Sequence, residues 1–497
     1  MRQASVLFTL LGAIGLAGFL SACSDGSPSA SASAGGASGS GSASASGTVT
    51  GFGSVIINGK RFETNNVLVK VDDDSETSCT IGPPSTPSNA SCGIKKGMVV
   101  TVNGSFNGAQ HTATSVRQKD AVEGLVQSVA PDKSSLMVMG QTVLVDSTTI
   151  IDNNITNRDL ATLQIGVDHV EVNGHIQPNG IIQATFIEKK LAPITPEVRG
   201  YVSSHNDNVT PKTFKIGSLT VDYTNTSPLG LSDMPSPGPN GDAWNGLFVE
   251  VKGANAGGFD SATTTLTASK VEPEDRGIGN NVDEFEVEGF VRQASVANGI
   301  ATFFIGTTEV RTTASTEFRE GTIDEIVDGA KVSAEGQLSG GVLTATHVKF
   351  KESARLEGDI ETLGPNSFTV KGLPGVTVLT NRQPRIDNGP LQANVHVRVR
   401  GRLTSANTII ATRIKVEAAD NDVVLQGQVQ QITGDNLQIL GVTVDTSTIS
   451  NDNFEGLDDQ VIGRTAFFNA VTVGTLVKVR GRLVGGTVTW REAELED

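Results

Sequence analysis

Apolar and charged side chains alternate along Val395-His396-Val397-Arg398-Val399-Arg400-Gly401. Successive side chains of a β-strand point to opposite faces, so strict alternation is typical of a strand with one buried face. We expect the three valines to face a core, and His396, Arg398 and Arg400 to face away from it. The stretch predicts a fold built from short, half-buried strands.

The end of this stretch, apolar-x-apolar-x-Gly, recurs along the chain, and a second pattern, x-Gly-x-(Val/Ile), precedes each copy. The closing glycines are Gly104, Gly174, Gly253, Gly336, Gly401 and Gly481. The opening glycines are Gly47, Gly124, Gly200, Gly289, Gly358 and Gly427. The period of roughly 70–90 residues is too long for a solenoid turn and is near the lower size of an independent domain. We therefore predict about six tandem small domains whose neighbours share some apolar surface.

Each unit carries the turn signals of five short strands. Asn-Gly pairs such as Asn58-Gly59 and Asn103-Gly104 favour hairpins. Between the third and fourth strands lies a variable stretch, for example 157–163 or 322–328, that can hold a helical turn. Five strands with a short helix after the third is the order of an OB-type barrel. An immunoglobulin-like sandwich is the alternative, but it needs roughly 100 residues.

The predicted fold class is therefore all-β, a tandem array of about six small OB-like five-stranded barrels after a signal peptide and a flexible linker. The expected segments are a lipoprotein signal peptide at 1–22, a Ser/Ala/Gly-rich tether at 23–46, and β repeats at 47–120, 121–192, 193–276, 284–352, 353–420 and 423–497.

The N-terminus predicts export from a bacterial cell. Arg2 precedes an apolar stretch, 6–20, that is too short for a comfortable membrane span. It ends in Leu20-Ser21-Ala22-Cys23, which resembles the lipobox of bacterial lipoproteins. We expect a lipid anchor on Cys23 at the cell envelope, and outer-membrane sorting in a Gram-negative cell because Ser24 is not Asp. An ordinary signal peptide with an accidental cysteine is the alternative.

The residues after Cys23 are almost entirely Ser, Ala and Gly up to residue 46. Such a segment has little apolar surface to bury, so it cannot offset the entropy lost on ordering. We expect a flexible coil with an r.m.s. reach of roughly 25–30 Å. It would act as a tether between the membrane and the folded units.

Cysteine usage and charge narrow the classes of partner. An exported compartment permits a disulfide between Cys79 and Cys92, and two cysteines with no nearby histidine make a poor zinc site. The net charge of −16 and the 5% aromatic content oppose nucleic-acid binding. We therefore expect no nucleic-acid partner, and contact with the membrane only through the lipid anchor.

With the repeats in view, the chain resembles the bacterial family called domain of unknown function 5666. The closest similarity is Gly51-Phe52-Gly53-Ser54-Val55, followed by Asn58-Gly59 and Phe62-Glu63-Thr64, where the family usually has Asp in place of Glu63. The stretch 97–104 resembles the family's Gly-x-x-Val-x-Val-x-Gly strand. The resemblance extends from Gly47 to the C-terminus. It implies exported, often lipid-anchored, multi-copy β-barrel proteins, and it brings no activity.

One acidic run could bind a cation such as calcium through carboxylate oxygens. It lacks the spacing and the glycine of an EF-hand loop, so a solvated charge run is the alternative. Its members are Asp72, Asp73, Asp74 and Glu76.

One basic face could bind a phosphate- or carboxylate-bearing polymer through guanidinium forks. Cross-strand pairing with neighbouring acids is the alternative. The face carries Arg398, Arg400 and Arg402, and Lys478, Arg480 and Arg482 repeat the pattern.

Catalytic motifs are missing from the sequence: there is no His-Glu-x-x-His zinc motif and no nucleophile elbow. We therefore expect no catalytic residues, no confident metal site and no cofactor, with calcium as the exception to test. The leading hypothesis is a non-catalytic envelope lipoprotein whose modules bind envelope polysaccharide or a surface protein, or act as a scaffold. The alternatives are a hydrolase of an envelope polymer, with any cleft near the insert that contains Trp244, and a pure structural spacer.

Overall fold

The structure is a computed structural model in which strands dominate. Within the described part of the chain the one α-helix is α2 (Gly463–Ala470), and no helix there has the length and apolar character that crossing a membrane requires. The described residues are 39–72, 76–82, 92–191, 193–236, 242–275, 277–381, 384–405, 407–457 and 460–496.

The second unit shows how each barrel closes. Its first, second and third strands pair antiparallel in that order, the third pairs parallel with the fifth, and the fourth joins the fifth to the first. This ring has the OB-type order, and the parallel ladder excludes the immunoglobulin-like sandwich. The strands are β8 (Val122–Val129), β9 (Ser135–Val138), β10 (Gln141–Leu144), β12 (His169–Ile176) and β13 (Ile182–Lys190).

Short helices follow the third strand of unit 2, as the sequence predicts. A two-residue strand, β11, pairs there with β13, and two 3-10 turns succeed it. Leu160, in the second turn, is buried in the core of the barrel. The elements are β11 (Ile150–Ile151), η1 (Thr156–Arg158) and η2 (Leu160–Thr162).

Units 1 and 3 close into the same five-strand ring with extra short strands. Unit 1 contains β1 (Ser40–Phe52), β2 (Val55–Ile57), β3 (Lys60–Glu63), β4 (Val67–Val71), β5 (Thr77–Cys79), β6 (Val99–Asn107) and β7 (Gln110–Gln118). Unit 3 contains β14 (Glu197–Tyr201), β15 (Ser203–Asn206), β16 (Thr213–Ile216), β17 (Leu219–Asp222), η3 (Leu229–Leu231), η4 (Asp242–Trp244), β18 (Phe248–Gly253), β19 (Phe259–Asp260) and β20 (Thr265–Pro273).

Units 4 and 5 also close. Unit 4 contains β21 (Val282–Ala297), β22 (Ile300–Ile305), β23 (Thr308–Arg311), β24 (Glu317–Arg319), η5 (Ile323–Glu325), β25 (Lys331–Ser339) and β26 (Val342–Phe350). Unit 5 contains β27 (Ala354–Leu363), β28 (Ser367–Val370), β29 (Thr377–Leu379), β30 (Arg385–Asp387), β31 (His396–Ser405) and β32 (Thr408–Val416).

Unit 6 has the same strand order, but its ring is open between the third and fifth strands. Among the described residues no ladder joins β35 to β38, and β36 pairs with β38 instead. The structure therefore contains several closed barrels in tandem rather than the expected six. Unit 6 contains β33 (Asp422–Thr433), β34 (Asn436–Ile439), β35 (Val442–Asp445), η6 (Thr446–Thr448), η7 (Asn451–Asn453), β36 (Phe454–Glu455), α2, β37 (Leu476–Val484) and β38 (Thr487–Glu496).

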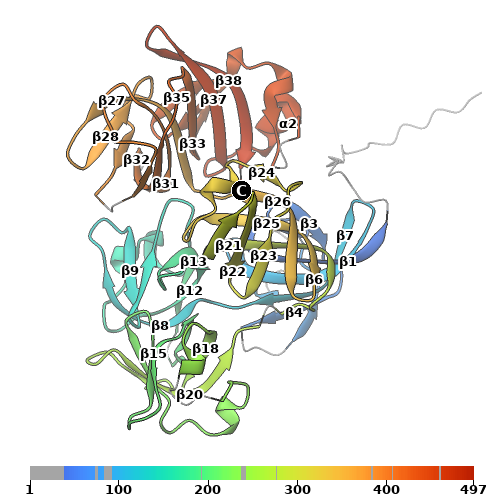
Figure 1. The fold of residues 1–497 in the computed structure, drawn as a ribbon, viewed down its shortest axis with the longest axis vertical. Helices are drawn as coiled ribbons and strands as arrows, with labels where there is room; N and C mark the ends of the chain where they lie inside the picture. The colour runs from blue at the N-terminus through green and yellow to red at the C-terminus, as the bar shows by residue number, and fades with distance from the viewer. Residues whose placement is uncertain are drawn as a thin grey trace, which may run out of the picture.

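The units are joined in pairs through their first strands. β8 of unit 2 pairs antiparallel with β14 of unit 3, and β27 of unit 5 pairs antiparallel with β33 of unit 6. Each of these pairs shares one continuous apolar core. In Figure 1, units 5 and 6 (orange to red) lie at one end of the long axis and unit 3 (green) lies at the other.

Units 1 and 4 form the third pair although two units separate them in the sequence. β1 runs parallel to β21, from Ala43 opposite Glu284 to Ser46 opposite Val287. Figure 1 shows the blue strands of unit 1 beside the yellow strands of unit 4. The sequence led us to expect apolar contacts between neighbours in the chain, so this long-range pairing is an addition that the repeats did not predict.

The predicted tether ends earlier than expected, because β1 begins at Ser40 rather than near Gly47. Its first residues pair antiparallel with β6 as well as parallel with β21, and Ala43 and Ala45 are buried. A strand between two neighbours gains backbone hydrogen bonds on both edges, which stabilise even a Ser/Ala sequence. Small side chains also fit the narrow space between two barrels.

We expect that removal of residues up to 46 weakens the contact between units 1 and 4. A chain that starts at Gly47 loses the ladder of Ser40–Ser46, so its free energy of unfolding should fall by about 3 kcal/mol or more, counting roughly 1 kcal/mol per net hydrogen bond. Chemical denaturation of chains starting at residues 24, 39 and 47 measures this. The first two should be equally stable, and equal stability of all three would contradict the role of β1.

Candidate functional site

Some of the predicted site residues lie within the described part of the chain, and others lie outside it. Cys23, Asp73 and Asp74 lie outside the described residues. Cys79 and Cys92 form a disulfide with their Cα atoms 6.0 Å apart. Glu76 is exposed at the start of β5, so Asp72 is the one member of the acidic run that the structure places at a junction between units.

The arginines of the predicted basic face contact protein groups. Arg398 Nε is 2.9 Å from the Glu357 carboxylate on the neighbouring strand, which is the cross-strand pairing considered above. Arg400 binds the carboxylates of Glu325 and Glu352 at 3.2 and 3.1 Å. Arg402 donates to the main-chain carbonyl of Val145 in unit 2. These contacts bind unit 5 to units 2 and 4.

The expected exposure of this strand needs a correction. His396 and Arg400 do face away from the core of unit 5, as alternation predicts, but both are only 3% exposed. Arg400 is covered by unit 4, with its guanidinium 4.5 Å from the centre of the Phe350 ring. Alternation identifies the side that faces away from the barrel's own core, and another barrel covers that side.

A second buried cation joins units 4 and 6. The side chain of Lys478 is fully buried, and its Nζ lies 2.7 Å from Glu320 and 2.8 Å from Glu496, with Glu494 also in contact. Burial alone would raise the pKa of Glu496, but Lys349 and Lys478 outweigh it and hold that pKa at about 2. Three carboxylates therefore share the ammonium group of Lys478, and Lys349 and Arg355 add positive charge at Glu496 and Glu320.

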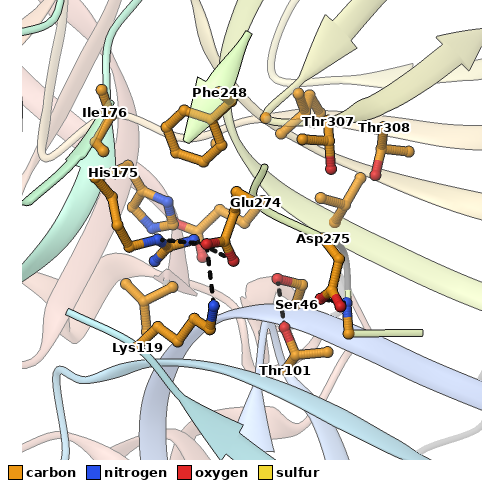
Figure 2. A pocket seen from close by; sticks show the side chains of 18 of the residues that line it. Ser46, Thr101, Lys119, His175, Ile176, Phe248, Glu274, Asp275, Thr307 and Thr308 are labelled. Atoms are coloured by element: carbon orange, nitrogen blue, oxygen red, sulfur yellow. Dashed lines mark hydrogen bonds and ion pairs between the residues drawn. The ribbon is translucent and has the colours of Figure 1, made fainter. Parts of the chain in front are cut away.

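A pocket of about 140 Å³ lies where units 1 to 4 meet. Figure 2 shows Lys119 pointing at Glu274, with Phe248 on the opposite wall. Lys119 Nζ is 2.6 Å from Glu250 and 3.1 Å from Glu274, and Arg199 Nη2 is 2.9 Å from Glu274. The space accommodates a few water molecules and excludes a polymer, since a water occupies about 30 Å³.

The charges of this pocket are balanced by ion pairs. Burial would raise the pKa of Glu250, but Lys119 and Lys252 outweigh it and hold the pKa at about 2. A carboxyl group that stays ionised cannot deliver a proton near neutral pH, so Glu250 is not suited to be a general acid. The pocket is a structural junction.

A third junction, which we call the acidic junction, brings together Asp72, Asp120 and Glu197. Carboxylate oxygens of the three lie within 4.8 Å of one another. Burial, followed by the charges of Asp72 and Glu197, raises the pKa of Asp120 well above its usual range. Burial and the same Asp72 charge, with Glu250, raise the pKa of Glu197 to about 9. Here the described cations do not balance the acids.

A much larger cavity, of about 1450 Å³, lies between units 1, 2, 4, 5 and 6. Among the described residues, four polar atoms of its lining residues are buried without a hydrogen-bond partner: Asn58 Nδ2, Gln183 Nε2, Thr185 Oγ1 and Arg400 Nε. The cavity is rich in hydroxyl groups, which come from Thr48, Thr50, Thr142, Ser147, Thr148, Thr185, Thr412, Thr472 and Thr475.

The described part of the insert of unit 3 packs against its own unit. Trp244 is 2% exposed, its ring stacks 4.4 Å from that of His205, and its Nε1 donates to the Pro235 carbonyl. The insert therefore shields the core of its own unit, and the large cavity lies elsewhere, in a space that unit 3 does not line.

Sequence reasoning missed Asp120, Glu197 and Lys478 as junction residues. A signal was present in the residue before each opening glycine, which is charged in four units. Glu288 contacts Lys331 and His175, Glu357 contacts Arg398, and Arg199 contacts Glu274. The recurring charge marks the strand on which the unit meets its neighbours.

We expect Lys478→Met to destabilise the protein strongly. The change leaves the carboxylates of Glu320, Glu494 and Glu496 buried without their shared cation, and loss of one partner of a buried pair costs about 3–5 kcal/mol. Chemical denaturation measures it. Arg482→Met on the same strand is the control, since that exposed pair with Asp422 contributes about 1 kcal/mol or less. Equal losses in both variants would contradict this role of Lys478.

His396 gives the stability of unit 5 a pH dependence through its contacts with Glu357 and Asp359. The Glu357 carboxylate, ahead of the opposing effect of burial, and then Asp359 raise the pKa of His396 above its ordinary value of 6.5. A raised pKa stabilises the fold fully below the unfolded value and loses this contribution as pH rises through the folded value. The difference in unfolding free energy between wild type and His396→Gln should therefore shrink as pH rises above 6.5.

Denaturation at several pH values checks this expectation, and the partly exposed His347, changed to Gln, is the matched control. A difference between wild type and His396→Gln that grows with pH, or that the control reproduces, would contradict the assignment.

Comparison with known proteins identifies one protein family that matches the chain. No curated protein and no solved structure matches the chain. The family model described as domain of unknown function (DUF5666) matches residues 123–188, 288–349, 357–415 and 426–490.

The matched regions lie in units 2, 4, 5 and 6 and cover just over half of the chain. Units 1 and 3 lie outside the matched regions, although the motif of unit 1 resembles the family most closely. Both carry long inserts, at the disulfide in unit 1 and before β18 in unit 3. Repeated matches at the pitch of the barrels show that this chain belongs to the family described as domain of unknown function DUF5666.

Proposed function

We propose that this chain is a lipid-anchored, non-catalytic protein of the bacterial cell envelope, whose fused barrels form one body that binds envelope polysaccharide in the large cavity. The observation that carries the binding role is the cavity of about 1450 Å³ between five units, whose wall is rich in hydroxyl groups. Ligand sites fix their ligands through a few polar groups placed on such a wall.

The size and chemistry of the cavity favour a polysaccharide. Sites for small molecules usually have volumes of roughly 300–1000 Å³, and this one has about 1450 Å³. Its wall offers hydroxyl and amide groups, which match the hydroxyl groups of a sugar. Arg400, Arg402 and Arg413 at the wall already contact carboxylates or carbonyls, which favours a neutral segment of polymer over a polyanion.

The proposed location rests on the N-terminal sequence, in which an apolar stretch ends at Cys23 within a lipobox-like motif. The Cys79–Cys92 disulfide is what an oxidising compartment permits. In a Gram-negative cell the anchor would lie in the outer membrane. Absence of catalysis is part of the proposal, and turnover of an envelope polymer would favour the hydrolase alternative.

We expect the double variant Thr142→Val/Gln183→Leu to bind envelope polysaccharide roughly tenfold more weakly, because two polar side chains of the cavity wall are lost, each contributing a hydrogen bond of about 0.5–1 kcal/mol. The two residues lie on β10 and β13, which pair with each other. A glycan array of bacterial envelope polysaccharides, followed by titration calorimetry with the glycan that binds, measures the effect with the chain from residue 24 to 497.

The matched control is Gln337→Leu/Thr344→Val, an exposed cross-strand pair on the outside of unit 4 that does not line the cavity. It should bind as the wild type does. If no glycan binds the wild type, the chain is a spacer and the binding proposal fails; if the control loses as much affinity as the cavity variant, the cavity is not the site.

A further inference from the structure

The acidic junction is built from three segments that are distant in the sequence. Asp72 follows β4 in unit 1, Asp120 lies in the short connection between units 1 and 2, and Glu197 begins β14 in unit 3. Their carboxylate oxygens lie within 4.8 Å of one another. Like charges at such a distance repel strongly in a buried setting, so the arrangement requires compensation.

The burial of Asp120 without a hydrogen-bond partner is a second, independent observation that favours a bound ligand at this junction. Its side chain is 1% exposed, and neither carboxylate oxygen has a hydrogen-bond partner among the described residues. An isolated buried carboxylate is very costly, and native proteins pair such groups or use them to coordinate metals. Arg199 donates to the main-chain carbonyl of Asp120, and its guanidinium pairs with the carboxylate of Glu274.

Glu197 has one oxygen in an ion pair and one to spare. Lys252 Nζ is 3.0 Å from Oε2, while Oε1 is buried with no hydrogen-bond partner in the described part of the chain. The same lysine also contacts Glu250 at 3.2 Å, so its charge is shared. Glu123 and Glu171 add further negative charge around Asp120, and burial with these acids raises the pKa of Asp120 well above its usual range.

We propose that Asp72, Asp120 and Glu197 bind a divalent cation, calcium by their chemistry, that links unit 1, the connection to unit 2, and unit 3. Calcium takes oxygen ligands at 2.3–2.6 Å, so two ligands on opposite sides of the ion are about 4.6–5.2 Å apart, and those closer together lie within that span. The 4.8 Å limit on the three oxygens fits this geometry. The set contains no histidine or cysteine, which disfavours zinc.

The site differs from the acidic run that the sequence suggested. Asp72 belongs to both, but the other two ligands come from segments 48 and 125 residues further along the chain, numbers that follow from positions 72, 120 and 197. Glu76 is exposed and is not among the three. The ion would stabilise an assembly of units and not a single loop.

The test uses the chain from residue 24 to 497 after treatment with EDTA, with calcium chloride as the probe. Calorimetric titration should show one equivalent bound at micromolar to millimolar calcium, and millimolar calcium should raise the melting temperature, because an ion that binds only the folded state stabilises it. In Asp120→Asn both effects should disappear. In EDTA this variant should be at least as stable as wild type, since a buried unpaired charge is removed.

Glu494→Gln is the matched control, because Glu494 belongs to another buried acidic group of the described chain, in which Lys478, Lys349 and Arg355 already contact the carboxylates. This variant should melt at a lower temperature yet keep the full calcium response. The proposal is overturned if wild type binds no calcium, or if Asp120→Asn responds to calcium as wild type does. It is also overturned if only a fall in pH stabilises wild type, since protons would then compensate the three carboxyl groups.

Discussion

The pairing of first strands between barrels is the constraint on which the rest of the structure depends. In a closed OB-type ring the first strand is long, and part of its edge stays unpaired after the ring is complete. Here that edge is covered by the first strand of another unit, as when β1 runs beside β21 and β8 beside β14. Each pairing removes an exposed edge and fixes two barrels in one register.

This pairing brings the outer faces of the barrels together, and those faces carry charge. Glu123 lies opposite both Glu171 and Glu197 in the ladders of β8, so acids from three strands meet. Burying a charge is costly unless an opposite charge or a hydrogen bond compensates it. This explains why Lys119, Lys478, Arg400 and Arg402 contact polar groups of other units. At the acidic junction the described cations do not suffice, and Glu197 keeps a pKa of about 9.

The sequence predicts the barrel better than the assembly. The glycine patterns follow from local sterics: a Cβ at Gly104 or Gly336 would collide with the carbonyl of the facing strand, at a β-bulge. Such constraints repeat with every unit and are therefore visible. The β1–β21 pairing depends on Ser40–Ser46, whose composition is that of a linker, and only the space between two barrels makes a strand of it. The same limit hid Asp120 and Glu197, since nothing in their local sequence shows that they meet.

The possible binding sites also depend on the assembly of the units and not on the single barrel. The described interiors of the barrels are filled with side chains, and Val172 and Ile182 of unit 2 and Val397 and Val399 of unit 5 are fully buried. The two spaces described above lie between units, and the walls of the cavity of about 1450 Å³ come from five units. In the proposed function, the units do not each carry one weak binding site. Instead, several units together form the wall of one cavity. An ion or ion pair that fixes two units therefore also sets the shape of the cavity between them.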